Sequence, residues 1–196
     1  MATSKRGEQA EQRRAQLVDV ALELFAERGF EATRISDIAE RAGVAQGLLY
    51  HYFKGKPELL AAIAERYSPL PLLRELLPDL TDQPARVALT DLAQRIYALI
   101  QQRRPLLQMV VRDVLWRPET REVAMWARET AIGYLVRYLD SRVVAGELRP
   151  HDGPVVAQTL ASALFLPAIA ELPYDPYVTG AIEVILRGIA VDPETI

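Results

Sequence analysis

The chain has 196 residues, of which 50% are hydrophobic, 25% are charged and 7% are aromatic, and it contains no cysteine. This apolar content is ample for a folded core and excludes an intrinsically disordered chain. The lack of cysteine excludes disulfide bonds, thiolate metal sites and cysteine nucleophiles, and two histidines are too few for a histidine-rich metal site. We therefore expect no metal and no other cofactor.

The formal net charge of −3 is unevenly distributed along the chain. Residues 1–67 contain ten basic and ten acidic residues, so the acidic excess lies entirely in the remainder. The segment 44–57 has no acidic residue but includes Lys54 and Lys56. The net charge therefore neither supports nor excludes a DNA-binding surface near residue 50.

The sequence shows no targeting or membrane-spanning segment. Its N-terminus is polar as far as Gln16 and lacks the apolar core of a signal peptide. The most apolar stretch, 155–170, is interrupted by polar residues and is shorter than the roughly 20 residues that a transmembrane helix needs. We expect a cytoplasmic protein.

Apolar residues in the N-terminal third recur every three or four positions, which predicts helices. Gly29 and Gly43 each follow such a pattern and are expected to end a helix. Thr33 precedes the second pattern and is its expected N-cap. The helices predicted in this part span about 9–28, 35–42, 45–53 and 57–67.

The cluster from Ser68 to Pro71 is expected to break the chain into two domains. Longer helical patterns follow it, over about 84–101, 104–116, 119–144, 153–170 and 176–190. We expect an all-α protein of about nine helices. Its expected parts are a flexible arm over 1–12, a three-helix helix-turn-helix domain over 13–67 and a larger helical domain over 68–196.

Two short helices joined by a tight turn and packed on a longer helix make a helix-turn-helix unit. In the third helix, Leu49 and Phe53 are four residues apart and suit packing on the first two helices. The other residues are then expected to point outward, namely Gln46, Gly47, Leu48, Tyr50, Tyr52 and Lys54. Such side chains suit contacts with phosphates and base edges in a major groove.

The runs GFEATRISDIA, from Gly29, and AGVAQGLLYHYFKGK, from Ala42, closely resemble the N-terminal domain of the tetracycline-repressor (TetR) family of bacterial regulators. The resemblance covers about residues 13–67. It implies a homodimer that binds a palindromic operator in double-stranded DNA. It also implies a C-terminal domain that binds a small-molecule effector and forms the dimer interface, most often in a repressor that the effector releases from DNA.

The resemblance implies base contacts at the start of the third helix. Gln46, Gly47 and Leu48 match positions that contact base edges, and Tyr50 matches one that touches the backbone and base methyl groups. Two departures remove a hydroxyl donor: Ala45 stands where serine is common, and Leu48 where threonine is common. Base reading is therefore expected to depend on Gln46 and on apolar contact with thymine methyl groups.

The resemblance implies phosphate contacts from four further residues. Tyr52 matches a position that reaches a phosphate, and Lys56, at the start of the fourth helix, matches the family's phosphate-gripping lysine. Thr33 and Ser36 match the start of the second helix, where hydroxyl groups approach phosphate. The alternative for these hydroxyl groups is simple helix capping.

The second domain shows no constellation of nucleophile and base, so we expect no enzyme activity. A helical domain of this size can enclose an apolar pocket, and we expect a mainly apolar or aromatic effector. The alternative is that the candidate residues belong to an ordinary core. The candidate pocket residues are Tyr97, Met109, Trp116, Met125, Trp126, Tyr134 and Tyr138, with Arg112 and Asp113 as polar anchors.

The last two predicted helices carry apolar stripes that can form a four-helix bundle across a two-fold axis. The alternative is that these stripes belong to the core of a single chain. The candidate interface residues are Leu160, Leu164, Val178, Ile182, Ile185 and Ile189.

Two other functions are compatible with the sequence. An architectural DNA-binding protein without an effector would have a filled core and would bind DNA equally with or without small molecules. A helical enzyme with an incidental helix-turn-helix would need a polar constellation inside a cavity.

Overall fold

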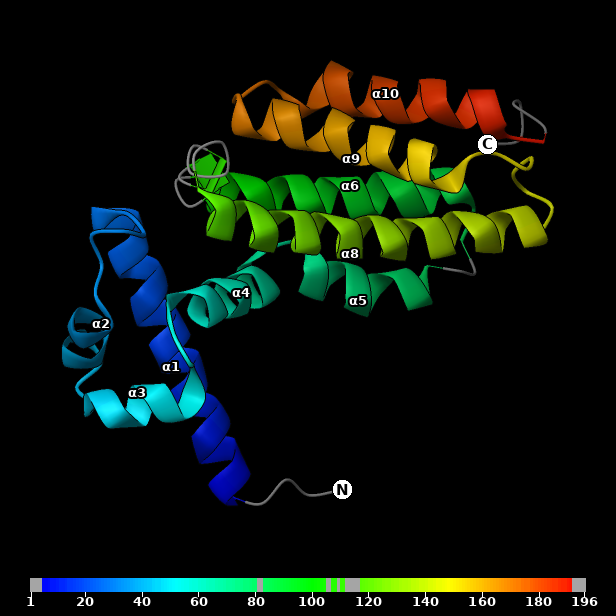
Figure 1. Ribbon diagram of the computed structural model, residues 1–196. Helices are drawn as coiled ribbons and strands as arrows, with labels where there is room; N and C mark the ends of the chain where they lie inside the picture. Colours follow the sequence, from blue (N-terminus) through cyan, green and yellow to red (C-terminus); the bar gives the residue numbers. More distant parts are fainter. Residues whose placement is uncertain (1–4, 81–82, 105–106, 109, 112–116, 192–196) are drawn as a thin grey trace. The chain divides into compact units, whose positions relative to one another are not determined.

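The computed structural model describes residues 5–80, 83–104, 107–108, 110–111 and 117–191 (Figure 1). It is all-α, as predicted, and its described residues contain no strand beyond an isolated bridge between Leu148 and Ala190. None of the described helices is long and apolar enough to cross a membrane. The helices are α1 (Lys5–Arg28), α2 (Ile35–Arg41), α3 (Gln46–Tyr52), α4 (Lys56–Tyr67), α5 (Leu70–Asp79), α6 (Ala85–Gln102), α8 (Pro118–Val144), α9 (Gly153–Ile169) and α10 (Tyr174–Ile189).

The chain divides into two compact units. The first comprises Met1–Arg66 and Met109–Ala124, and the second comprises Tyr67–Gln108 and Met125–Ile196. The sequence patterns placed everything after residue 67 in a single second domain, so the first unit is larger than expected. Helix α8 contributes residues to both units.

The first unit is built around the buried face of α1. Leu17 and Phe25 are fully buried there, and α2 packs on α1 and on α3. The turn between α2 and α3 passes through Gly43 at φ +67°, a conformation that favours glycine. The Gln16 side chain donates to the carbonyl oxygen of Ala42 at 3.2 Å and so ties α1 to that turn. These contacts hold α2 and α3 as a helix-turn-helix pair.

Helix α1 begins earlier than predicted. Its first two turns lie within 1–12, which the sequence analysis assigned to a flexible arm. These residues include Glu, Gln, Ala and Arg, which favour helix, and residues 7–12 are exposed. The helix therefore continues there by local propensity, although it buries nothing that a hydrophobic pattern could reveal.

Helix α5 lies where the prolines of the sequence predict a break between domains. Pro71 lies in the first turn, where no intrahelical partner awaits its missing N–H group. Pro78 lies in the last turn. Leu73 and Leu77 on this helix are buried in the core of the second unit, which explains why the segment is helical.

The core of the second unit is formed mainly by α6, α9 and α10, which pack on one another (Figure 1). Ile100 of α6, Leu139 of α8 and Leu186 of α10 are among its fully buried side chains. Arg149 donates to the carbonyl oxygens of Ala190 and Gly188 and so satisfies the end of α10. Part of the predicted helix 104–116 lies outside the described residues.

Candidate nucleic-acid interface

Helix α3 presents the face that its sequence pattern predicts. Leu49 is fully buried and Phe53, which follows the helix, is 2% exposed. Tyr52 is half-buried. Four residues of α3 that were expected to contact bases are exposed, namely Gln46, Gly47, Leu48 and Tyr50. The packing contacts therefore leave an uninterrupted outer face at the start of this helix.

The start of α3 lacks a side-chain cap. Ala45 occupies the N-cap position and makes no side-chain hydrogen bond there. A Cβ built on Gly47 would meet nothing within 4 Å, so the fold itself does not require glycine at that position. The first turn of α3 is thus uncapped by any side chain and sterically open at Gly47.

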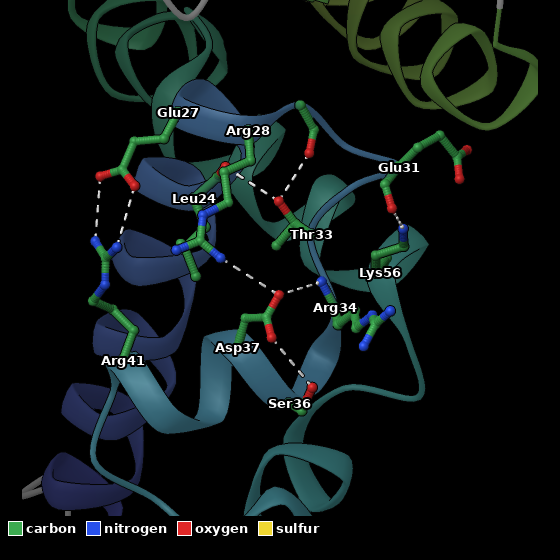
Figure 2. Close-up of polar contacts among 11 residues, drawn as sticks. Leu24, Glu27, Arg28, Glu31, Thr33, Arg34, Ser36, Asp37, Arg41 and Lys56 are labelled. Atoms are coloured by element: carbon green, nitrogen blue, oxygen red, sulfur yellow. Dashed lines mark hydrogen bonds and ion pairs between the residues drawn. The ribbon is translucent and has the colours of Figure 1, made fainter.

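Thr33 is not placed as the sequence analysis expected. Its side chain is buried, and Arg34, not Thr33, is the N-cap of α2. The Thr33 hydroxyl lies 2.8 Å from the carbonyl oxygen of Gly29 and 3.2 Å from that of Leu24 (Figure 2). It therefore satisfies carbonyl groups at the end of α1, and a buried hydroxyl cannot reach a phosphate.

Lys56 also differs from its expected role. Its Nζ donates to the carbonyl oxygens of Phe30, at 2.8 Å, and Glu31, at 3.2 Å (Figure 2). The same ammonium group lies 4.6 Å from the centre of the Phe30 ring. Two of its three donors are thus used within the protein, which makes Lys56 a positioning residue for the loop between α1 and α2.

Arg34 is an exposed cation that the sequence analysis did not select. Its backbone N–H donates to Asp37 at 3.1 Å, which fixes the start of α2. Figure 2 shows its guanidinium group directed away from Asp37 and without a partner among the residues drawn. Ser36, which was selected, is exposed, and its hydroxyl lies 3.4 Å from a carboxylate oxygen of Asp37. Thr33 is buried and Arg34 is exposed, so Arg34 is the better placed of the two to contact a phosphate.

Acidic groups near this surface are paired with cations. Glu27 accepts two hydrogen bonds from Arg41, each at 3.2 Å, and these bonds hold the pKa of Glu27 below its ordinary value. Arg28 lies 3.6 Å from Asp37. Such pairing reduces the negative potential that the carboxylates would otherwise present to an approaching phosphate.

The candidate effector residues are not gathered into one described site. The Tyr97 hydroxyl donates to the carbonyl oxygen of Leu172, and its ring packs edge-on against Tyr174 at 5.3 Å. The Tyr134 hydroxyl accepts a hydrogen bond from Arg74 at 3.2 Å. Met125 and Trp126 are exposed, and Tyr138 is buried in the core. Met109, Arg112, Asp113 and Trp116 lie outside the described residues.

The candidate interface residues need a correction. Leu160, Leu164, Val178 and Ile182 are buried in the core of their own chain. Ile185 and Ile189 are partly buried against the same core. The periodicity identified an apolar stripe correctly, but a stripe alone does not say whether its neighbour belongs to the same chain. Among the described residues, no group of three His, Cys, Asp or Glu side chains could hold a metal ion.

Comparison with known proteins identifies the first unit. Helices α2 and α3 form a helix-turn-helix pair, and the outer face of α3 is exposed. Residues 17–63 match the family model "Bacterial regulatory proteins, tetR family". A segment of 51 residues is 49% identical to the HTH-type transcriptional repressor KstR2 of Rhodococcus jostii. That segment covers 26% of this chain and spans about a quarter of the length of that relative.

The second unit is recognisable by its fold. The repressor SmeT of the Stenotrophomonas maltophilia multidrug efflux pump SmeDEF is 24% identical, with a TM-score of 0.70 over 91% of each chain. Salmonella enterica GusR is 20% identical, with a TM-score of 0.70 over 90% of this chain and 94% of its own. Residues 17–63 are thus similar to the TetR family of bacterial regulatory proteins, and the chain shares its fold with these two structures.

Proposed function

We propose that the protein is a transcriptional regulator that binds double-stranded DNA through the outer face of α3. The observation that carries this proposal is the exposure of Gln46, Gly47, Leu48 and Tyr50 on a helix whose opposite face is buried. A major groove about 12 Å wide accommodates one helix, so this face can approach base edges. The matched family model covers the same helix.

The residue types suggest how DNA is read. The Gln46 amide can pair bidentately with adenine, and Leu48 can contact a thymine methyl group. The Tyr50 ring can reach a methyl group while its hydroxyl donates to a phosphate, and Tyr52 supplies a second hydroxyl. Ser36 and Arg34, at the start of α2, add phosphate contacts, while Lys56 positions the loop behind them.

We propose further that the protein works as a homodimer on a palindromic operator. A dimer presents two α3 helices about 34 Å apart, one turn of DNA, so that each reads a half-site. Helix α9 supports this proposal because none of its 17 residues is charged, yet Val155, Phe165 and Leu166 are exposed. Exposed apolar side chains on an uncharged helix suit an interface, and a second copy would cover them.

The exposed residues of α9 define the proposed interface more closely than its buried stripe. Val155, Thr159, Ser162 and Leu166 follow a spacing of four, three and four residues and so share one face, which we call the outer face of α9. All four are exposed in the single chain. This face replaces the buried residues that the sequence analysis assigned to the dimer.

The effector forms the last part of the proposal. A small apolar or aromatic molecule bound in the second unit would release a repressor from DNA if it bound one of two conformations more tightly. The intramolecular contacts of Tyr97 and Tyr134 favour a filled core in their vicinity, as in an architectural DNA-binding protein without an effector. Nile red, an apolar dye, distinguishes the two candidates. A repressor with an effector pocket should increase the dye's fluorescence and lose DNA affinity, and an architectural protein should do neither.

The replacement Gly47→Ala tests the DNA-binding face. Alanine should raise helix stability by up to about 1 kcal/mol, because glycine is the poorer helix former and the site is open. The added methyl group should nevertheless lower DNA affinity roughly tenfold, because it enters the space that a base edge would occupy. Fluorescence anisotropy with the DNA upstream of the protein's own gene measures the affinity, and thermal unfolding measures the stability.

Gly133→Ala in α8 is the matched control, because its added Cβ would meet only the end of the Arg137 side chain, at 3.6 Å. It should stabilise the protein without changing DNA affinity. If wild-type protein forms no sequence-specific complex, or if Gly47→Ala binds as tightly as wild type, then α3 is not the DNA-reading helix.

A further inference from the structure

Arg117, the residue before α8, contacts the loop between α1 and α2. Its Nη1 lies 2.9 Å from Oε1 of Glu31. The carbonyl oxygen of Arg117 also accepts a hydrogen bond from the backbone N–H of Arg121, at 3.0 Å. Arg117 is therefore attached to the first turn of α8 while its side chain holds a residue of the helix-turn-helix unit.

The loop that Arg117 contacts is also attached to the start of α4. The Glu31 carbonyl oxygen accepts from Lys56 Nζ, and so does that of Phe30. Lys56 is the first residue of α4 and follows the end of α3, at Tyr52, by four residues. Glu31 thus makes two contacts. Its carboxylate pairs with Arg117, just before α8, and its carbonyl oxygen accepts from Lys56, in the segment after α3.

These contacts are better suited to transmit a movement than to stabilise the fold. The Arg117 and Glu31 side chains are 32% and 59% exposed, and ion pairs this exposed contribute little to stability. Helix α8 begins in the first unit and continues through Val144 in the second. A displacement of α8 along its axis would therefore change the distance between Arg117 and Glu31.

We propose that the Arg117–Glu31 ion pair couples α8 to the DNA-binding unit, so that the position of the first turn of α8 sets the order of the loop from Gly29 to Arg34 and thereby operator affinity. This inference rests on the proposed function. Arg117 and Glu31 are positioning residues, which act through the loop and Lys56 and not through contact with DNA. A change in the second unit that moves α8 weakens DNA binding by releasing this loop.

The neutral variants Glu31→Gln and Arg117→Gln, alone and combined, test the coupling. Each single variant should weaken DNA binding about fivefold, and the double variant should weaken it no further, because one interaction is lost in all three. Each should also speed amide hydrogen exchange in residues 29–34 severalfold. The charge exchange Glu31→Arg with Arg117→Glu should restore both properties toward wild type.

A simple effect of charge on DNA affinity would look different. Losing the acid would then strengthen binding, losing the base would weaken it, and the two effects would cancel in the double variant. That pattern, or unchanged exchange in residues 29–34, would overturn the inference. The exchange measurement needs no DNA, so it tests the coupling even if the wild-type protein binds no operator.

The pair Glu27–Arg41 provides the matched control, because this ion pair links α1 to α2 and its two partners belong to neither α8 nor the loop from Gly29 to Arg34. Its partners are exposed to a similar degree, at 50% and 40%. Glu27→Gln with Arg41→Gln should leave exchange in residues 29–34 unchanged.

Discussion

The outer faces of α3 and α9 are both uncovered in the single chain, but they differ in chemistry. Helix α3 exposes an amide, a phenol and a glycine beside one leucine, so its surface can form hydrogen bonds. The outer face of α9 carries a valine and a leucine with a threonine and a serine between them, on a helix without any charge. The first surface suits a polar partner such as a base edge, and the second, which is uncharged and partly apolar, suits a second copy of itself. One fold thus separates the surface proposed for DNA from the surface proposed for self-association.

The largest effect is expected from a charge on the outer face of α9. Leu166→Glu should convert a dimer to monomer, because two buried carboxylates would face each other across the two-fold axis. Loss of the second half-site should then weaken operator binding by a factor of roughly 100 or more. Analytical ultracentrifugation and fluorescence anisotropy measure the two effects.

Val87→Glu is the control for this substitution, since Val87 is a similarly exposed apolar residue on α6. It should leave both the sedimentation coefficient and the affinity unchanged. A Leu166→Glu protein that remains dimeric would show that α9 is not the interface.

Thr33→Val should distinguish a structural hydroxyl from a DNA contact. Removal of this buried hydroxyl leaves carbonyl oxygens at the end of α1 without their donor, which should cost about 1–3 kcal/mol in the free energy of unfolding. Urea denaturation measures this cost. Ser36→Ala, at an exposed site, should change stability by less than about 0.5 kcal/mol. Equal stabilities for the two variants would contradict the structural role of Thr33.

Arg34→Gln should lower DNA affinity by roughly fivefold and reduce the salt dependence of binding by about one phosphate contact. The physical reason is the loss of a single charge at the start of α2, without loss of packing. Anisotropy titrations over a range of salt concentrations measure both quantities. A variant that keeps the wild-type salt slope would place Arg34 away from the DNA.

The smallest effect is expected from Tyr138→Phe in the second unit. The Tyr138 hydroxyl is buried and has no hydrogen-bond partner among the described residues, so its removal should change stability at pH 7 by less than about 1 kcal/mol. Burial raises the pKa of Tyr138 to about 12. Between pH 10 and pH 12 the unfolded tyrosine loses its proton while the folded one keeps it, so wild-type stability should fall as the pH rises.

Tyr138→Phe should lose this part of the pH dependence. Urea denaturation at pH 7 and at pH 10.5 measures the difference between the two proteins. If both lose the same stability at the higher pH, other groups account for alkaline unfolding.

The sequence pattern predicted the first unit better than the second. The spacing of Leu49 and Phe53 fixed which side of α3 is buried, because a helix of seven residues has only one face that can pack. The same reasoning failed for Leu160 and Leu164 of α9, since an apolar stripe does not show whether it packs on its own chain or on a second copy. Burial in the three-dimensional structure made that choice.

The roles of Thr33 and Lys56 show the same limit at the level of single side chains. Both are polar residues in a recognised motif, and the resemblance assigned both to phosphate. Only the tertiary structure shows that their donors are directed to carbonyl oxygens at the end of α1 and in the following loop. A hydrogen bond depends on direction, and direction is set by packing and not by position in the chain.

The sequence by itself determined the all-α class and the helix-turn-helix unit, because these follow from short-range spacing. The motifs of residues 29–56 carried the resemblance to the TetR family. Which apolar faces stay uncovered, which cations are already engaged, and how Arg117 reaches Glu31 across 86 positions of sequence depend on long-range contacts. These contacts decide the surfaces available to DNA and to a second copy, because packing leaves only part of each helix exposed.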